Sequence, residues 1–378
     1  MPFKIKNYTN VIFLLAILLV VFFLYQRYKD KLDREHDSEN YDVIQKYLLT
    51  ESDLVNGKDT KPILWIFLKY DYNSRDWLSF GSRSSTNLNQ PYLYLTAKTI
   101  IKQCEDSFHI CFVDDYSFAK LIPDWNIDMQ KLANPIKQNV RDMGMTKLLY
   151  RYGGIRVPIS FVCMRNLSAL FESGTAQDKM FICETTDRNV TSTHRDFYPN
   201  IEFMGAKKEN RMVMELIDFM QRTISTDYTS ESPFLGEFNR WCELRIQHNK
   251  INLIDGKMIG TKTMDDTAIG IETLLSNDYI DLYPQTYGIY IPADEILKRN
   301  HYSWFARMSA TQILESRTIL CKYLLLSSAP DAHMGVIEPM KPDKKWVSFW
   351  KVPSGAPVWG LKPNDLGNRV PKIPYPAQ

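Results

Sequence analysis

Several side chains in this sequence could hold an anionic ligand or a metal ion. Asp114 and Asp115 follow the apolar run HICFV and could serve as catalytic carboxylates or as ligands of Mg²⁺ or Mn²⁺, which prefer carboxylate oxygens. Arg156 follows a glycine pair and could instead hold a phosphate group bidentately, with a surface salt bridge as the alternative. The chemistry indicated is the binding of a phosphate-bearing ligand at the end of a strand.

Some of these residues also have plainer interpretations. Acids at strand ends are often solvated loop residues, and the pair Asp265-Asp266 is better explained as the N-cap of a helix over 267–277. Gly153 and Gly154 allow a ligand to approach the backbone closely, or they simply make a tight turn between a helix and a strand. For the glycine pair and Tyr152 the structural interpretation is slightly favoured.

The elements that would position these residues alternate between strand and helix. Apolar runs of strand length occur at 61–70 and 108–117, whereas helical spacing occurs at 91–107, 139–154, 213–224 and 267–277. The glycine pair ends the helix over 139–154. This order predicts a parallel α/β sheet of Rossmann-like type with flanking helices, whose site lies at the C-terminal ends of the strands.

The two ends of the chain differ from this central part. After a short tail (1–10), residues 11–25 read VIFLLAILLVVFFLY without a charge, which predicts a single transmembrane helix. A highly charged stalk (26–60) follows it. Residues 329–378 are rich in proline and tryptophan, which predicts an extended tail that packs on its own domain or binds a protein partner.

Composition excludes some functions and leaves one question open. The formal charge is only +2 and there is no basic stripe, so nucleic acid is not an expected partner. The six cysteines form no C-x-x-C pair, which argues against zinc-ribbon and thioredoxin-like sites. We expect them to be small buried residues, although one or two disulfides could form in an oxidising lumen.

The block RDMGMTKLLYRYGGI (141–155) resembles the helix-to-strand element of glycosyltransferases that carry an Asp-x-Asp sugar-binding region, a group that includes capsular-polysaccharide and initiating mannosyltransferases. Residues 197–220, 281–288 and 300–304 resemble three later blocks of that family in the same order. The resemblance implies a GT-A-like nucleotide-sugar domain over 61–328. It also implies binding of the nucleotide sugar by Asp142, Tyr152, Gly153, Gly154, Arg156 and Trp304, with His301 as a late metal ligand.

This chain departs from the family where the metal should bind. Pro158 and Ser160 stand where the two acids are expected, so the usual Mn²⁺ or Mg²⁺ site is expected to be absent. Two hypotheses follow: a membrane-anchored glycosyltransferase that works without Asp-x-Asp, and an inactive copy of the fold that serves as a structural or interaction protein. The chain is also similar to proteins of large DNA viruses of algae and protists, which would place it in a host secretory membrane or a virion membrane.

Overall fold

The computed structural model describes residues 20, 22–25, 61–69, 92–132, 136–186, 196–226, 236–298, 300–306, 308 and 310–333. The expected tail 1–10, the stalk 26–60 and residues 334–378 of the expected C-terminal tail lie outside the described residues. Residues 329–333, expected to be extended, are instead the end of a helix over Ile319–His333. Of the expected transmembrane segment only residues 20 and 22–25 are described, and they are helical. No helix in the described ranges has both the length and the apolar character needed to cross a bilayer.

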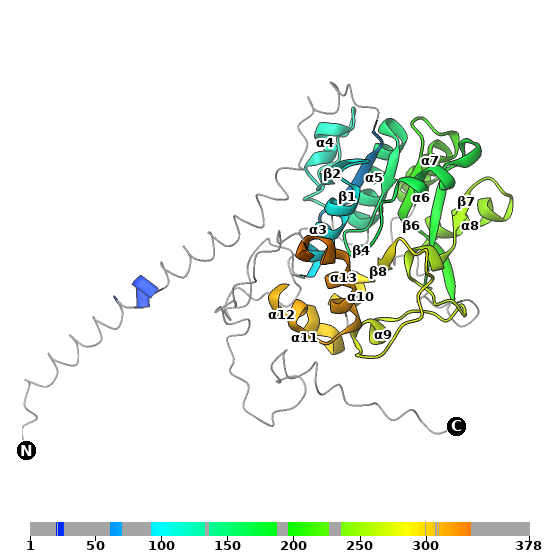
Figure 1. Ribbon diagram of the computed structural model, residues 1–378. Coiled ribbons are helices and arrows are strands. Elements are labelled where there is room, and N and C mark those ends of the chain that lie inside the picture. Colours follow the sequence, from blue (N-terminus) through cyan, green and yellow to red (C-terminus); the bar gives the residue numbers. More distant parts are fainter. Residues whose placement is uncertain are drawn as a thin grey trace, which may run out of the picture. The chain divides into compact units, whose positions relative to one another are not determined.

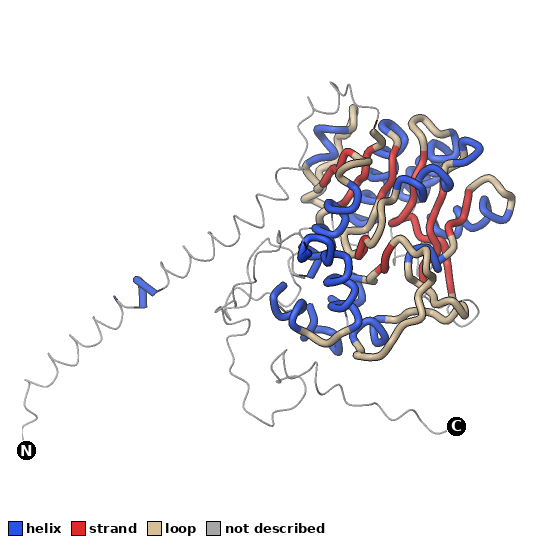
Figure 2. Tube along the Cα trace, in the orientation of Figure 1, coloured by secondary structure: helices blue, strands red, loops and turns tan. Residues whose placement is uncertain are grey.

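The chain divides into residues 1–48 and 49–378, and the second unit holds an α/β fold (Figures 1 and 2). Its strands are β1 (Ile63–Phe67), β2 (His109–Val113), β3 (Gly154–Arg156), β4 (Phe161–Cys163), β5 (Phe181–Thr186), β6 (Phe197–Ala206), β7 (Asn252–Ile254) and β8 (Gly288–Tyr290). Its first helices are α3 (Tyr92–Cys104), α4 (Ser117–Leu121), α5 (Ile136–Tyr152), α6 (Ser168–Gly174), α7 (Arg211–Thr226) and α8 (Glu237–Gln247). The later ones are α9 (Ile271–Leu275), α10 (Ala293–Lys298), α11 (Ser303–Ala306), α12 (Ala310–Glu315) and α13 (Ile319–His333).

The main sheet has six strands in the order β2-β1-β3-β6-β5-β7, and it is mixed. Strands β2, β1 and β3 run parallel, β6 is antiparallel to both β3 and β5, and β7 is parallel to β5. A separate antiparallel pair joins β4 to β8. The α/β prediction is therefore confirmed, whereas the expectation of a purely parallel sheet is wrong because β6 reverses direction.

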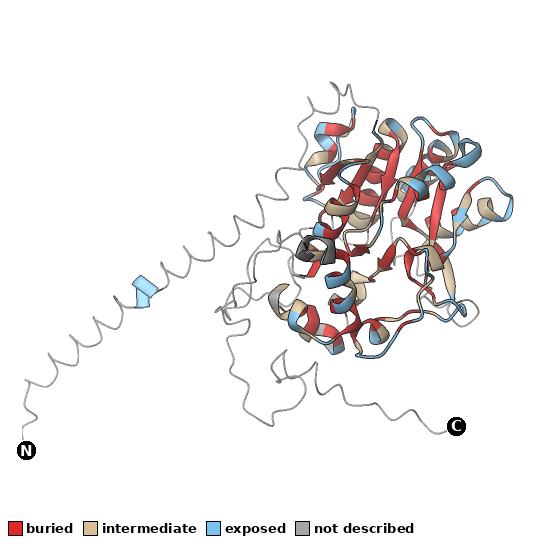
Figure 3. Ribbon diagram, viewed as in Figure 1, coloured by how far each residue is buried: buried red, intermediate tan, exposed pale blue. Residues whose placement is uncertain are grey.

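Two apolar clusters hold the layers together. In the first, α4, α5, α7 and α8 cover one face of the main sheet, with the fully buried Trp65 of β1 at its centre. In the second, α3 and the helices α9 to α13 pack around Val162 of β4, on the side of the fold where Figure 1 shows α9 to α13 together. Figure 3 shows that the strands of the main sheet are mostly buried, as expected for strands covered on both faces.

The turn from α5 into β3 explains the glycine pair. Gly153 and Gly154 have φ values of 73° and 106°, in the region that favours glycine. A Cβ on Gly154 would lie 2.0 Å from the carbonyl oxygen of Ile63, and one on Gly153 would lie 2.7 Å from the backbone nitrogen of Lys208. The carbonyl of Gly153 accepts a hydrogen bond from the Trp65 indole. The close approach at this pair is therefore to the protein's own chain.

The helix expected over 267–277 is shorter, and its N-cap is not an aspartate. Helix α9 covers only Ile271–Leu275 and begins after Gly270. Asp266 instead lies in a turn with φ of 61° and forms ion pairs with Lys257 at 3.0 Å and Lys262 at 3.7 Å. The N-cap prediction for Asp265-Asp266 was wrong because the chain after them pairs as a β-bridge between Lys262 and Ala268, and the helix begins only at Ile271.

All six cysteines are buried free thiols, which confirms the packing interpretation. Two of them nevertheless lie in contact, since the sulfur atoms of Cys104 at the end of α3 and Cys163 at the end of β4 are 3.9 Å apart. The contact with Cys163 lowers the pKa of Cys104, whereas burial raises the pKa of Cys163. Two thiols in contact, one of them with a lowered pKa, are a favourable arrangement for disulfide formation by thiol–disulfide exchange.

We therefore expect refolding in a glutathione redox buffer to link Cys104 to Cys163. Peptide mapping without reduction is the measurement, and the closed loop should stabilise the fold by about 2 kcal/mol. Cys104→Ser should remove the linked peptide, whereas the control Cys183→Ser should leave it unchanged. A map showing six alkylated thiols, or a link to another cysteine, would contradict the prediction.

Candidate functional site

Charged and polar side chains gather where β1, β2 and β3 end. Antiparallel β6 brings its N-terminal half to the same edge, and α5 begins above it. We call this group the edge cluster; it consists of Lys69, Asp115, Lys137, Gln138, Arg141, Asp142, Arg156, Glu202, Tyr290 and Asp294. The C-terminal edge of parallel strands is the place where α/β sheets bind ligands.

The centre of the edge cluster is a buried ion pair between β3 and α5. Arg156 Nη2 donates to Asp142 Oδ1 at 2.6 Å, and the two side chains are only 7% and 12% exposed. Gln138 Nε2 lies 3.3 Å from the other oxygen of Asp142. The alternative of a surface salt bridge for Arg156 is therefore wrong, because this pair is buried at the edge of the sheet.

Within the part of the chain that the structure describes, two buried atoms beside Asp142 have no hydrogen-bond partner. They are Nη1 of Arg156, a donor, and Oε1 of Gln138, an acceptor. A buried polar atom without a partner costs roughly 1–3 kcal/mol, and more when the group is charged. An acceptor atom from outside the described residues is therefore expected next to the Arg156 guanidinium.

A second buried pair fixes the neighbouring part of the cluster. Arg141 holds Asp115 bidentately, with Nε at 2.8 Å from one oxygen and Nη2 at 2.7 Å from the other. Lys137 lies 3.5 Å from the same carboxylate. This aspartate is thus neutralised by cations of α5, which leaves it poorly suited to act as a base or a metal ligand.

Glu202 of β6 is the most perturbed carboxyl group of the cluster. Tyr290 Oη of β8 donates to its Oε2 at 3.1 Å. Burial, followed by the carboxylates of Asp294 and Asp142, raises the pKa of Glu202, and the positive charges of Arg156 and Lys69 offset this in part. Lys69 itself lies 3.3 Å from Asp294 of α10.

The remaining predicted site residues lie in other surroundings. Asp114 accepts hydrogen bonds from the backbone of Tyr116 and Ser117 and from the Ser117 hydroxyl, so it caps the turn before α4. Tyr152 donates to the carbonyl of Leu121 and packs against Trp65, as a core residue does. The structure thus brings Asp115, Asp142 and Arg156 to one edge and uses Asp114, Tyr152 and the glycine pair for the fold.

His301 and Trp304 lie in the part of the chain that contributes Tyr302 and Phe305 to the second apolar cluster. Trp304 is half-buried and packs edge-on against Phe305. His301 is exposed, and its ring contacts Tyr302. Within the described residues, no three potential ligands among His, Cys, Asp and Glu lie close enough together to bind a metal ion.

The donor set at the edge does not fit a divalent cation. Ser160 is buried and its carbonyl accepts from the backbone of Ile291, while Pro158 begins a turn closed by the backbone N–H of Phe161. The aspartates nearby, Asp115 and Asp142, are paired with arginines. Cationic side chains thus take up the carboxylates that a Mg²⁺ or Mn²⁺ ion would need.

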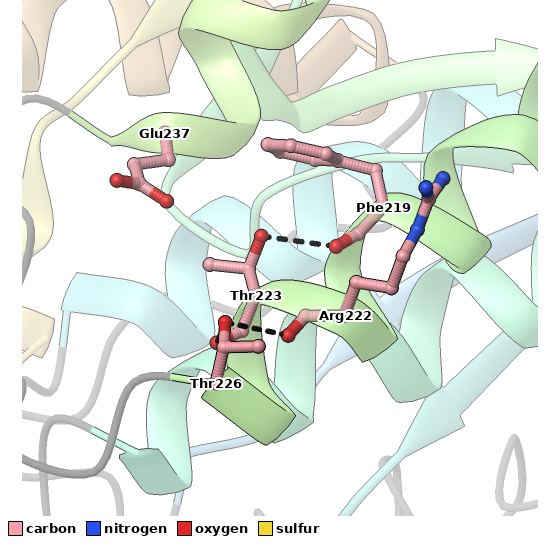
Figure 4. Close-up of a pocket in the computed structure, with 5 residues that line it drawn as sticks. All are labelled: Phe219, Arg222, Thr223, Thr226 and Glu237. Carbon is pink, nitrogen blue, oxygen red and sulfur yellow. Dashed lines mark hydrogen bonds between the residues drawn. The ribbon is translucent and has the colours of Figure 1, made fainter.

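A shallow pocket of about 420 Å³ lies elsewhere, between the end of α7 and the start of α8 (Figure 4). Its lining residues are Phe219, Arg222, Thr223, Thr226 and Glu237. Both threonine hydroxyls bond to carbonyls of their own helix, as the dashed lines show. The pocket shares no residue with the edge cluster, and both of its threonine hydroxyls already donate to carbonyls of α7, so we place the candidate site at the edge cluster.

No model of a known protein family matches this chain, and no curated protein matches it. The glycosyltransferase resemblance therefore remains a prediction, and the geometry of the edge cluster has to carry the functional argument.

Sequence reasoning missed Glu202 and three residues that surround it in the edge cluster, namely Lys69, Tyr290 and Asp294. Two of them carry a recognisable signal. Lys69 follows the apolar run of β1 almost at once, and Glu202 is a lone acid in the apolar strand segment IEFMGA. A single charge within or just after a buried strand indicates a partner or a ligand, because burying an unpaired charge is costly.

Proposed function

We propose that this protein is a glycosyltransferase of GT-A-like fold that binds a nucleotide sugar at the edge cluster without a metal ion. The observation that carries the proposal is Arg156, a buried arginine at the end of a central parallel strand with an N–H group that has no hydrogen-bond partner among the described residues. Guanidinium groups hold phosphate oxygens well, and sheet ends of this kind bind nucleotides. Residues 11–25 would anchor the domain to a membrane.

Cationic side chains are as numerous as carboxyl groups in the cluster. Four of them, Lys69, Lys137, Arg141 and Arg156, face three aspartates and Glu202. Burial raises the pKa of Glu202, which disfavours its negative charge relative to an ordinary glutamate. The departing diphosphate gains negative charge as the glycosidic bond breaks, and cationic side chains can stabilise it in the place of a metal.

The second candidate is an inactive copy of the fold that acts as a structural or interaction protein. It is favoured by the pairing of both Asp115 and Asp142 with arginines and by the packing of Pro158 and Ser160 into a turn. In this case Arg156 would serve only to neutralise Asp142. The two candidates differ in one measurable property, the binding of a donor.

Thermal unfolding of the full chain in mild detergent tests the proposal. The ligands are UDP-glucose, UDP-galactose, UDP-N-acetylglucosamine and GDP-mannose, each with MnCl₂ and with EDTA. We expect one donor at a hundredfold excess over its Kd to raise Tm by about 5 °C, equally in EDTA. Arg156→Lys should lose this shift, because lysine keeps the charge but not the planar fork.

Arg222→Lys provides the matched control, since Arg222 is an exposed arginine in the pocket between α7 and α8. It should leave the donor-induced shift unchanged. A shift that disappears in EDTA would contradict metal-free binding. No shift with any donor would leave the structural role as the better account.

A further inference from the structure

Glu202 lies on β6, the strand that pairs with the strand of Arg156. In the antiparallel pair β3–β6, Arg156 is opposite Met204, and Glu202 stands two residues before Met204. The register of β6 against β5 shifts at this point, from Ile182 opposite Met204 to Cys183 opposite Asn200, so Glu202 lies in an irregular stretch of the strand. The charges of Arg156 and Asp142 nevertheless act on its carboxyl group.

The two oxygens of the Glu202 carboxyl group have different surroundings. Oε2 is held by the Tyr290 hydroxyl at 3.1 Å. Oε1 receives no hydrogen bond from any described residue, and no cation of the described part forms an ion pair with Glu202 within 4 Å. One oxygen thus fixes the orientation of the group and the other remains available, as a proton acceptor requires.

Four charged groups of the described residues act on Glu202: Asp142 of α5, Arg156 of β3, Lys69 after β1 and Asp294 of α10. The neutral phenol of Tyr290 on β8 donates a hydrogen bond to it. Both aspartates raise the pKa of Glu202, as does its burial, which is the largest cause, while Arg156 and Lys69 lower it. A carboxyl group whose pKa is raised toward neutral pH is a better base than an ordinary one.

We propose that Glu202 is the catalytic base of the transfer reaction and that Tyr290 is its positioning residue. This inference rests on the proposed function. The Glu202 carboxylate takes the proton of the acceptor hydroxyl as that oxygen bonds to the anomeric carbon of the donor. The bond from the anomeric carbon to the diphosphate breaks, and its electron pair leaves on the phosphate oxygen, next to Arg156.

The test uses the full chain and measures two properties separately. Donor binding is followed by the Tm shift with the same four nucleotide sugars, and turnover by the release of nucleoside diphosphate, with water as the acceptor. Glu202→Gln should lower the release rate by roughly 10²- to 10⁴-fold while the donor-induced Tm shift persists. The control Glu215→Gln, at a carboxylate on the outer side of α7 that pairs only with exposed Arg211, should change neither property.

Tyr290→Phe tests whether the hydroxyl of Tyr290 positions Glu202, without removing the aromatic ring. It removes the hydrogen bond to Oε2 but keeps the ring, so the release rate should fall less than in Glu202→Gln and its pH profile should shift. In the wild type the rate should rise with pH as Glu202 ionises and then level off. In Glu202→Gln this rise should be absent.

The outcomes distinguish the inference from the proposed function. If Glu202→Gln released nucleoside diphosphate as fast as the wild type, the base role would be overturned while donor binding would stand. The same holds if the wild type bound a donor but released no nucleoside diphosphate. No donor binding by the wild type would overturn both.

A stability measurement checks the same group without turnover. Because its pKa is raised in the fold, ionisation of Glu202 opposes folding. The measured quantity is the Tm of the wild type minus that of Glu202→Gln. This difference should be largest at a pH below the ordinary glutamate pKa and should fall as pH rises through the raised pKa of Glu202. Above that pKa it should stay constant. A difference that does not depend on pH would remove the base role.

Discussion

Replacing Gly154 with alanine is expected to destabilise the fold by about 4 kcal/mol, because two penalties combine at this position. The φ angle of 106° is strained for any residue with a Cβ. The new Cβ would also lie 2.0 Å from the carbonyl oxygen of Ile63. Neither strand can move away easily, because β3 is paired with β1 on one side and with β6 on the other.

Urea unfolding followed by tryptophan fluorescence measures this change, since Trp65 is fully buried beside the turn. Gly270→Ala is the matched control. Gly270 has an ordinary φ of −90°, and its new Cβ would meet only the end of the Glu272 side chain, at 3.2 Å. This variant should change the free energy of unfolding by less than about 1 kcal/mol. If Gly154→Ala and Gly270→Ala lowered the free energy of unfolding by similar amounts, the explanation of the glycine pair by backbone strain and close packing would be contradicted.

Arg156→Met should cost about 3–5 kcal/mol, because it leaves the Asp142 carboxylate buried without its cation. The pair is 2.6 Å apart and its side chains are 7% and 12% exposed, so water cannot replace the arginine well. Asp142→Asn in the same background should recover much of the loss, since the amide carries no charge to be desolvated. The double-mutant cycle, measured by urea unfolding, gives the coupling energy directly.

An exposed pair provides the comparison for this cycle. Arg211 and Glu215 are 3.2 Å apart on α7, but their side chains are 91% and 37% exposed. Arg211→Met should change the free energy of unfolding by no more than about 0.5 kcal/mol. A cost for Arg156→Met as small as that for Arg211→Met would show that the Asp142 carboxylate is well solvated, against the burial described above.

The parts of the fold that were predicted correctly are those with a strong local pattern. The apolar runs of β1 and β2 and the helical spacing of α3, α5 and α7 all appear near their expected bounds. The mixed sheet was not predicted, because the direction of β6 depends on how the chain connects it to β5 and not on the residues of β6. Helix α9 was too long in the prediction because Ala268 and Ile269 pair with Lys262 and Thr261 in a β-bridge, which periodicity does not reveal.

The candidate site was predicted in part for a similar reason. Asp142 and Arg156 were each identified from one contiguous block, although their ion pair was not. Lys69, Glu202 and Asp294 come from three distant parts of the chain, so no spacing in the sequence relates them. Only the pairing of β3 with β6 and the position of α10 bring them to one edge.

The long contact between Lys69 and Asp294, which are 225 residues apart, has a consequence for how the protein is made. The Asp142–Arg156 pair spans 14 residues and the Asp115–Arg141 pair spans 26, so both can form early in translation. Tyr290 and Asp294 leave the ribosome much later, and distant contacts also close slowly. In a nascent chain the Asp142–Arg156 and Asp115–Arg141 pairs are therefore expected to form before Tyr290 can contact Glu202 and before Asp294 can contact Lys69.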